Sequence, residues 1–235
     1  LLVRAGAEEH VEESVPTFSA PSQLQQHAVI VPPKLRLVSL IALLRRSLPR
    51  TADAETVGAA RIVVFFSCTD SVDFHWRALG GAKMRSSSAD AADSTADDAA
   101  TMPPLAQHSD LLPGAPIYRL HGSMTQTERI ASLRAFHQLT DGTDAPPARR
   151  GGVLLCTSVA SRGLDLPDVR CVVQMDVPTE GVEEYVHRVG RTARAGRQGT
   201  SWLLLLPHEK VWLTTLAQRM VVASERPGAP PRSPC

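Results

Sequence analysis

The sequence predicts an α/β fold, with a mostly parallel sheet and helices on both faces. Its β-rich runs, such as residues 61–67 (RIVVFFS), are apolar throughout instead of alternating apolar and polar residues. Strands of that kind are buried on both faces, which is typical of parallel sheets covered by helices. These runs alternate along the chain with segments whose apolar residues recur at helical spacing. In such folds, ligands bind at the carboxyl ends of the strands, so we look for chemistry on the turns that follow them.

The expected elements follow one another in a regular order. Pro32 and Pro33 end the first strand, and apolar residues then recur at helical spacing. In full, strands are expected at 26–31, 61–67, 115–120, 153–157, 171–175 and 201–206, and helices at 35–44, 71–79, 125–139, 180–190 and 209–220. Two of these helices carry a clear apolar face, made of Val72, Trp76 and Leu79 in one and of Ile130, Leu133 and Phe136 in the other.

One folded unit is expected, with irregular segments at both ends and inside it. Residues 1–25 are polar, contain two prolines and indicate a linker. Residues 80–114 include the run SSSADAADSTADDAATMPP, which has almost no large apolar residue to offset the entropy lost on ordering. We therefore expect a folded lobe at 26–222 with a disordered insertion at 80–114, and a flexible Pro-rich tail at 223–235. Docking of the insertion to a partner is the alternative interpretation.

Composition excludes several classes of protein. The formal net charge of +1 predicts no general attraction to polyanions, so any nucleic-acid site must be a local patch. The four cysteines include no CxxC pair, so a zinc site is not expected, and their use fits a reducing compartment. No apolar stretch reaches the roughly 18 residues that a membrane-spanning helix needs. The chain begins without Met, and we expect it to be a piece of a longer protein.

The segment at 185–199 (YVHRVGRTARAGRQG) holds four arginines and no acidic residue. Arg191 and Arg194 are three residues apart, so on a helical turn they would share one face and reach one phosphate group. A guanidinium donates in a fixed fork that matches phosphate oxygens and stays charged at any relevant pH. Such a pair could neutralise the charge on a transferring phosphoryl group, as an arginine finger does. A solvated basic turn remains the alternative from charge alone.

The segment at 156–165 (CTSVASRGLD) directly follows a buried strand. Thr157 and Ser158 could cap a following helix, whose free N–H groups would suit a phosphate. Gly163 permits a close backbone approach, and Asp165 could accept hydrogen bonds from a ribose hydroxyl. A plain strand–turn–helix with an aspartate in its loop is the alternative.

The segment at 120–129 (LHGSMTQTER) places a strand end before the start of a helix. Gln126 and Arg129 are three residues apart near the positive end of that helix, after the turn at Gly122. A polyanion backbone would be favoured there by the helix dipole and by the side chains together. An exposed helix surface with an incidental ion pair is the alternative.

The three segments together resemble the motifs of one family. HGSMTQTER, TSVASRGLD and HRVGRTARAGR, in this order, resemble those of the second lobe of DEAD-box RNA helicases, and VVFFS resembles the motif that precedes them. The match extends over residues 55–222 outside the insertion. It implies a RecA-like three-layer sandwich, and HRxGRxxR after TSxASRGLD is a highly specific combination.

The resemblance implies a nucleotide site shared between two lobes. The first and second arginines of GRxxR, here Arg191 and Arg194, would reach the ATP phosphates as the catalytic residues of this lobe. Asp165 would contact the nucleotide ribose, with Gly163 beside the nucleotide. The phosphate-binding GxxxxGK[ST] loop and the DEAD sequence are absent, so Mg²⁺ would be held by a first lobe.

The resemblance also implies RNA contacts and an interface between the lobes. Thr157 would hold an RNA phosphate, and Gly122, Gln126 and Arg129 would belong to the RNA-binding set. His187 and Arg162 would join the hydrogen-bond network that faces the first lobe. The sequence departs from the family at Ser158, where many members have Asp; serine is expected to be acceptable there.

The function implied is ATP-driven duplex unwinding, and this chain alone is expected to hydrolyse no ATP. The phrases PSQLQQHAVIVPPKLRLVSLIALL, VVFFSCTDSVDFH and VLLCTSVASRGLDLPDV resemble nucleolar DEAD-box helicases that act in large-ribosomal-subunit assembly. The expected setting is therefore the nucleus and nucleolus, with pre-ribosomal RNA and the first lobe as partners, no membrane, and a monomeric state.

Two other functions stay open. An isolated, non-catalytic RNA- or protein-binding lobe is one, and an upstream GxxxxGK[ST] and DEAD sequence would argue against it. A DNA translocase lobe is the other, because related motors share the arginine motif. A dinucleotide-binding enzyme is a poor third, since no GxGxxG follows the first strand.

Overall fold

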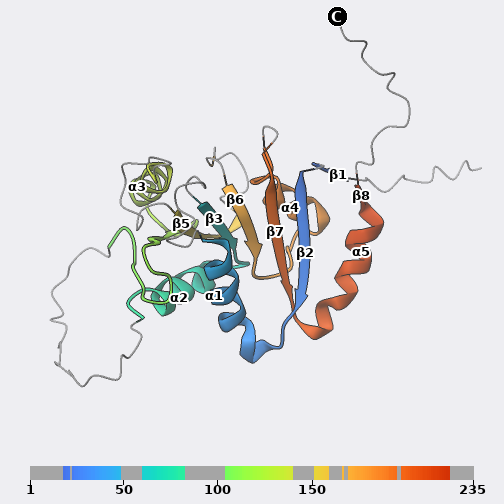
Figure 1. The fold of residues 1–235 in the computed structure, drawn as a ribbon, viewed down its shortest axis with the longest axis horizontal. Coiled ribbons are helices and arrows are strands. Elements are labelled where there is room, and N and C mark those ends of the chain that lie inside the picture. Colours follow the sequence, from blue (N-terminus) through green and yellow to red (C-terminus); the bar gives the residue numbers. More distant parts are fainter. Residues whose placement is uncertain are drawn as a thin grey trace, which may run out of the picture.

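The computed structural model describes residues 18–21, 23–48, 60–82, 104–139, 151–158, 166, 169–194 and 197–222 (Figure 1). The strands in these ranges are β1 (Phe18–Ala20), β2 (Leu24–Ile30), β3 (Ala60–Phe65), β4 (Ile117–Leu120), β5 (Gly151–Cys156), β6 (Val169–Gln174), β7 (Gly199–Leu205) and β8 (Met220–Val222). The helices are α1 (Arg36–Ser47), α2 (Thr69–Leu79), α3 (Gln126–His137), α4 (Val182–Val189) and α5 (Val211–Arg219), with short 3₁₀ turns at Pro33–Leu35 and Pro207–Lys210.

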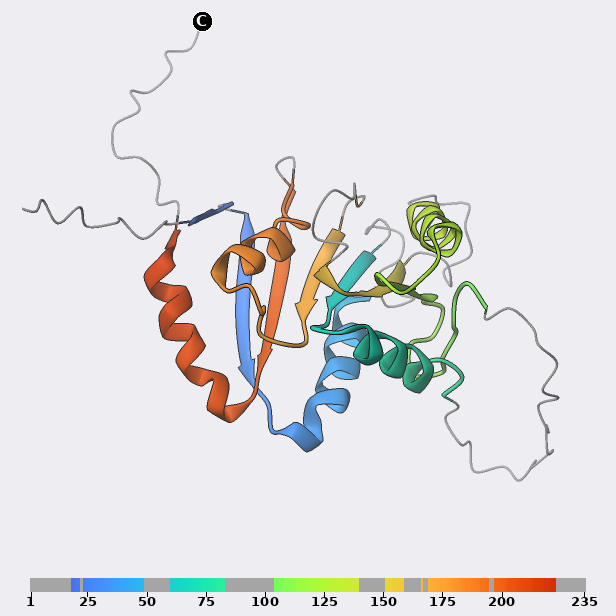
Figure 2. The same cartoon turned by 180° about the vertical axis from the view of Figure 1, so that it is seen from behind.

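The main sheet has six strands in the order β2-β7-β6-β3-β5-β4, and all of its pairs are parallel. Every residue of the central strand β3 is buried. Ile62 and Val64 belong to a core with α1 and α2, while Val63 and Phe65 face the opposite core, which includes Phe136 of α3. Helix α4 lies behind the sheet in Figure 1 and in front of it in Figure 2. The predicted parallel sheet with helices on both faces is confirmed.

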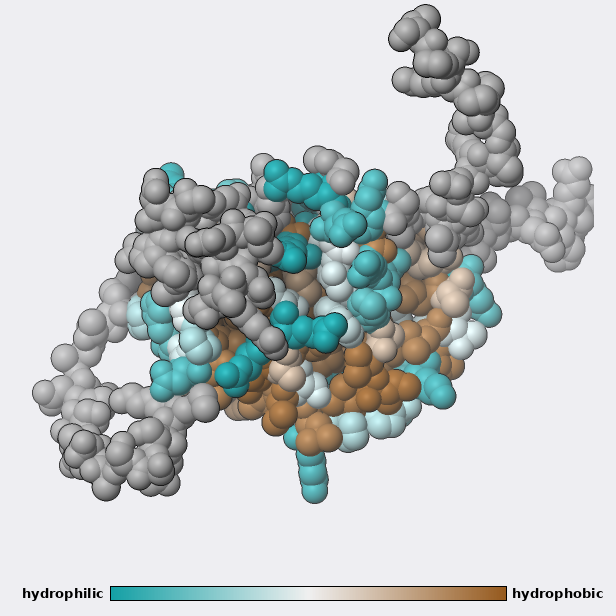
Figure 3. All heavy atoms as spheres, viewed as in Figure 1, coloured by the Kyte–Doolittle hydropathy of each residue, from teal (hydrophilic) through white to brown (hydrophobic). Residues whose placement is uncertain are grey.

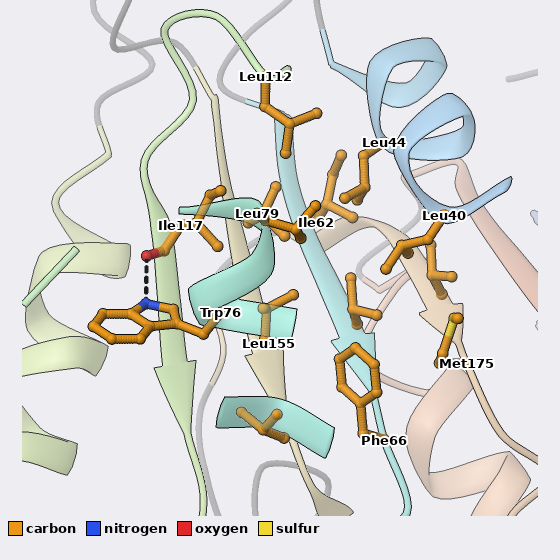
Figure 4. Packing of buried hydrophobic residues seen from close by; sticks show 14 of the residues in the cluster. Leu40, Leu44, Ile62, Phe66, Trp76, Leu79, Leu112, Ile117, Leu155 and Met175 are labelled. Carbon is orange, nitrogen blue, oxygen red and sulfur yellow. Dashed lines mark hydrogen bonds between the residues drawn. The ribbon is translucent and has the colours of Figure 1, made fainter. Parts of the chain in front are cut away.

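The larger core fills the space between the sheet and helices α1 and α2 (Figure 4). Leu40 and Leu44 of α1 and Leu79 of α2 are fully buried, and burying a side chain of this size contributes about 1.5–3 kcal/mol. The indole Nε1 of Trp76 donates to the carbonyl oxygen of Ile117 at 3.1 Å, so α2 is also bonded to β4. The face predicted for α2 is therefore the buried one.

The predicted apolar stripe of α3 was only partly right. Phe136 is fully buried and Leu133 partly so, but Ile130 is 39% exposed. The buried face instead includes Ser132, and α3 contacts the sheet at strands β4 and β5.

The insertion predicted at 80–114 includes too many residues at its carboxyl end. Residues 104–114 are ordered against the sheet: Gln107 forms a bridge with Ile117, and Leu112 is fully buried in the larger core. On the other side, the Gly81 N–H donates to the His108 carbonyl at 3.0 Å. The leucines that follow the Ser/Asp-rich run supply the apolar surface that the run itself lacks. Residues 83–103 lie outside the described residues.

The linker predicted at 1–25 was also too long. Phe18–Ala20 forms strand β1, which pairs in parallel with β8, with Phe18 opposite Met220. Strand β2 then begins at Leu24 rather than Gln26. A three-residue strand carries too few residues to show periodicity, so its partner, distant in sequence, decides its conformation. The rest of the predicted linker and the predicted tail at 223–235 lie outside the described residues.

In the view of Figure 3, polar residues gather over the upper part of the described surface and apolar residues over the lower part. The described helices include none that is long and apolar enough to cross a membrane.

Candidate functional site

The carboxyl ends of the central strands are tied together by hydrogen bonds. Asp176 follows β6, and its Oδ2 accepts from the backbone N–H of Ser67, just after β3, at 3.1 Å. Its Oδ1 forms an ion pair with Nη2 of Arg36, at the start of α1, at 2.8 Å. After β5, the Thr157 N–H donates to the Leu120 carbonyl at the end of β4 at 3.2 Å. Turns that are far apart in sequence therefore form one edge.

A buried ion pair lies on the side of α4 that faces this edge. Nη2 of Arg188 lies 2.8 Å from Oε1 of Glu184, and the two side chains are 0% and 2% exposed. The same nitrogen donates to the Ser158 hydroxyl at 3.0 Å, and that hydroxyl donates in turn to Glu184. Ser158, just after β5, is thus hydrogen-bonded to both Glu184 and Arg188 of α4.

The charge state of Glu184 follows from these contacts. Burial raises its pKa, but the hydrogen bonds from Ser158 and from the Glu180 N–H, together with the charge of Arg188, outweigh burial and hold the pKa below its ordinary value. Glu184 is therefore the anion that compensates Arg188 at neutral pH. A buried cation without such a partner would be strongly destabilising.

Arg188 also fastens α4 to the strand ends. Its Nη1 donates to the Asp176 carbonyl at 3.4 Å, and its guanidinium lies 5.4 Å from the centre of the Phe65 ring. Together with Ser158, these contacts join α4 to the ends of β3, β5 and β6. The turn that follows α4 then leads to the amino end of β6, where Thr192 Oγ1 donates to the carbonyl oxygens of Val169 at 2.5 Å and Arg170 at 3.2 Å.

Arg191 and Arg194 lie on that turn and not on the helix, which ends at Val189. Ala193 has a positive φ of 55°, so the backbone between them does not follow a helical path, and the two arginines do not share a helix face. Both side chains nevertheless bind carbonyl groups at the end of α4. Arg191 Nε donates to the His187 carbonyl at 3.3 Å, and Arg194 Nε donates to the Gly190 carbonyl at 2.8 Å. Arg191 is partly exposed and Arg194 is exposed.

Several buried polar atoms around the strand ends have no hydrogen-bond partner among the described residues. They include the hydroxyl of Thr157, whose residue is 8% exposed, and Nδ1 of His187, together with both amide atoms of Gln174 and Nε of Arg188. Buried polar groups normally find partners, because an unmade hydrogen bond costs about 1–3 kcal/mol. Thr157 and His187 are also residues that the sequence predicts to meet RNA and the first lobe.

The start of α3 is capped by a threonine and a glutamate. Thr125 is the N-cap, and it exchanges hydrogen bonds with Glu128 in a capping box. This leaves Gln126 exposed and Arg129 partly exposed at the positive end of the helix. Gly122 lies in the exposed turn between β4 and α3, two residues after the carbonyl of Leu120 that binds the Thr157 N–H. The turn and the end of β5 are therefore neighbours.

Three predicted residues, Arg162, Gly163 and Asp165, lie outside the described residues. Conversely, sequence reasoning missed Glu184 and Asp176 and gave Arg188 no role. The Glu184–Arg188 spacing of four residues was the available signal, since such pairs meet on a helix. Its burial was not visible in the sequence. Among the described residues, no group of three or more His, Cys, Asp or Glu side chains could hold a metal ion.

Comparison with known proteins gives the family. The model of the family described as "Helicase conserved C-terminal domain" matches residues 92–196. The ATP-dependent RNA helicase DBP7 of Mycosarcoma maydis is 52% identical over 233 residues, which cover 94% of this chain and 24% of that protein. The ATP-dependent RNA helicase dbp7 of Schizosaccharomyces pombe is 41% identical over 211 residues, covering 88% and 27%. The chain spans about a quarter of the length of these relatives.

Solved structures agree on the fold. The DEAD-box helicase Mss116 bound to ssRNA and UDP-BeF matches with a TM-score of 0.60 and 22% identity, over 91% of this chain and 34% of that one. A DEAD box protein from Methanococcus jannaschii matches with a TM-score of 0.56 and 22% identity, over 86% and 41%.

These findings, with the fold and the edge described above, define the chain as the helicase C-terminal lobe of a DEAD-box protein, with the RecA-like α/β fold. Within that family, the two relatives quoted are both ATP-dependent RNA helicases that bear the name DBP7.

Proposed function

We propose that this chain supplies half of the ATP site and part of the RNA site of an ATP-dependent RNA helicase with two lobes. The observation that carries the proposal is the buried link between Arg188 and Ser158, at 3.0 Å. It fixes α4, which leads into the arginine-bearing turn, to the end of β5, where the Thr157 hydroxyl awaits a partner. A motor needs such a link, because one movement of the lobe must act on nucleotide and RNA together.

For the nucleotide, Arg191 and Arg194 would act on the phosphates once the lobes close. Each side chain already donates through Nε to the end of α4, which orients its guanidinium and lowers the entropy lost when it meets a phosphate. As arginine fingers, they would neutralise charge that develops on the transferring phosphoryl group. Gly163 and Asp165 would lie beside the nucleotide, with the Asp165 carboxylate on a ribose hydroxyl. ATP would bring Mg²⁺ bound mainly by the first lobe.

For the RNA, the buried Thr157 hydroxyl would donate to a backbone phosphate. Gln126 and Arg129 would add contacts at the positive end of α3, next to the turn at Gly122. All of these groups suit phosphates and 2′-hydroxyls rather than base edges, so sequence specificity should be low. His187 and Arg162 would join the network between the lobes. Closure would bend one RNA strand out of duplex geometry, and hydrolysis would reopen the cleft.

The test is RNA-stimulated ATP hydrolysis by the two-lobe protein with Arg191→Lys. Lysine keeps the charge but loses the fork, and an arginine finger contributes about 10³–10⁵ in turnover, so we expect a loss on that scale. Arg197→Lys, an exposed arginine on the same segment, is the matched control and should retain turnover. Wild-type turnover in Arg191→Lys would refute the finger role. Unwinding of a DNA duplex in preference to an RNA duplex would favour a DNA translocase instead.

We further propose that the protein acts on pre-ribosomal RNA in the nucleolus, as a monomer. The support is the resemblance to nucleolar DEAD-box helicases of large-subunit assembly, in segments that include β2, α1 and β3, outside the shared motifs. Crosslinking of the protein to RNA in cells, followed by sequencing, would test this. Enrichment of large-subunit precursor sequences is expected, and enrichment of messenger RNA would refute it.

A further inference from the structure

A cavity of about 200 Å³ opens towards the amino end of the sheet, away from the carboxyl ends of the strands. It is lined by the last turn of α1 and by the first residues of β2, β6 and β7. The arrows of β2 and β7 both point downwards in Figure 2, so their amino ends lie at the top, away from the carboxyl edge. With about 3.3 Å per residue along a strand, the lining residues lie roughly 10–16 Å from that edge.

The cavity is cationic and contains no carboxylate. Arg46 of α1 and Arg170 of β6 line it, and neither has an ion-pair partner among the described residues. Arg170 is the extra residue of a β-bulge, where Val169 and Cys171 flank it opposite consecutive residues of β3. A bulge re-aims a side chain that would otherwise alternate across the sheet. Two unpaired guanidinium groups beside a cavity make a site for an anion.

An aromatic pair forms another wall of the same cavity. The rings of His27 and Trp202, on the paired strands β2 and β7, are stacked with their centres 4.3 Å apart and an angle of 22° between them. His27 is exposed, so the stack is open on its outer side. Gln25, Ser47 and Thr200 add an amide and two hydroxyls. The site thus combines cations, an aromatic platform and neutral hydrogen-bonding groups.

This combination of groups matches one nucleotide of a single-stranded nucleic acid. Arginines suit a phosphodiester, an aromatic ring stacks on a base, and hydroxyl and amide groups suit a 2′-hydroxyl. A phosphorylated peptide would use the arginines but leave the aromatic platform without a partner. The volume is below the roughly 300 Å³ of pockets that enclose a free small molecule, so a segment of a chain fits better than a free cofactor.

We propose that this cavity is a second binding site for single-stranded RNA, with the phosphate on Arg46 and Arg170 and a base stacked on His27. The inference rests on the proposed function only in taking RNA as the nucleic acid that the protein meets. The cavity adjoins the turn that bears Arg191 and Arg194, because Thr192 of that turn donates to the Arg170 carbonyl at 3.2 Å. It would raise the affinity for strands long enough to reach both ends of the sheet.

The test measures binding of a fluorescein-labelled oligouridine to the 235-residue chain, by anisotropy at several salt concentrations. The variant is Arg46→Ala with Arg170→Ala, and the matched control is Arg45→Ala with Arg77→Ala, two exposed arginines outside the cavity. Loss of two phosphate contacts on a single strand should reduce the salt slope by about 1.4, and the control should not. His27→Ala should weaken binding roughly 5- to 150-fold, the range for loss of one base–aromatic stack.

Photocrosslinking of a 4-thiouridine oligonucleotide, with mapping of the crosslinked peptide, locates the contact. A crosslink in β2 or β7 that the cavity variant abolishes supports the proposal. Absence of such a crosslink, or equal binding by the cavity variant and its control, overturns it. A phosphoserine peptide that binds this cavity when oligouridine does not would assign it to a phosphoprotein instead. Thr157→Val tests RNA binding at the carboxyl edge separately. An incorrect proposal for one of the two RNA sites can therefore be recognised independently of the other.

Discussion

Glu184 and Arg188 form a buried ion pair, 2.8 Å apart, and the hydroxyl of Ser158, just after β5, is hydrogen-bonded to both of them. Removing two charges from water is expensive, and good geometry with further hydrogen bonds is needed to offset that cost. Here the Glu180 N–H and the Asp176 carbonyl provide such bonds. The pair thus holds α4, which leads into the turn that bears Arg191, against the strand ends.

Glu184→Gln should destabilise the chain by about 3–5 kcal/mol at neutral pH, because it leaves the Arg188 charge buried without a counter-charge. Urea unfolding followed by circular dichroism would measure the change. Glu183→Gln is the matched control: Glu183 is the exposed neighbour on the same helix, and its loss should change stability by no more than about 0.5 kcal/mol. Equal effects of the two substitutions would contradict this prediction.

The same carboxyl predicts a pH dependence. The folded-state pKa of Glu184 is lower than its ordinary value of 4.5, so the unfolded chain binds the proton more readily. The stability contributed by Glu184 is therefore fully present above pH 4.5 and is lost as the pH falls through the folded-state pKa. The gap in stability between wild type and Glu184→Gln should narrow below pH 4.5. Denaturation curves between pH 3 and pH 7 would show this, and a constant gap would count against it.

Thr157→Val should separate stability from RNA binding. The Thr157 hydroxyl is buried without a partner, so its replacement by a methyl group should leave stability unchanged or raise it. Affinity for oligouridine should fall by about 1.5–3 kcal/mol, the contribution of a hydrogen bond to a charged group. Thr157→Ser keeps the hydroxyl and serves as the control. If Thr157→Val bound RNA as tightly as wild type, Thr157 would not hold a phosphate.

The chain alone should hydrolyse ATP at no measurable rate, because the phosphate-binding loop and the metal-binding carboxylates are absent from its sequence. A colorimetric phosphate assay with RNA present would check this. The reference is the variant with both Arg191→Ala and Arg194→Ala. Turnover clearly above that of the variant would mean that this lobe has a complete site of its own.

Long elements with strong patterns were predictable from the sequence. The run at 61–67 is apolar at nearly every position, so it predicted a strand buried on both faces, and β3 occupies the centre of the sheet. The apolar face of α2 was equally clear, since Trp76 and its neighbours recur at helical spacing. Short elements were missed: β1 depends on pairing with β8, some 200 residues away, and no local pattern carries that information.

The candidate site was predictable in its composition but not in its connections. The motifs named Thr157, Gln126, Arg191 and Arg194, yet they did not show that the backbone between the two arginines departs from helical geometry at Ala193, after α4 has ended at Val189. That departure depends on tertiary contacts, because Thr192 Oγ1 donates to the Arg170 carbonyl at 3.2 Å and the residue forms a bridge to β6.

The position of β7 between β2 and β6 has a consequence for synthesis on the ribosome. β2 is made before the other strands of the sheet, yet its only strand partner in the described sheet is β7, which emerges roughly 170 residues and about 10–30 s later. Until then β6 presents an unpaired backbone edge, and β2 has nothing to join. Nascent chains halted before Gly199 should therefore be the ones that aggregate or recruit chaperones.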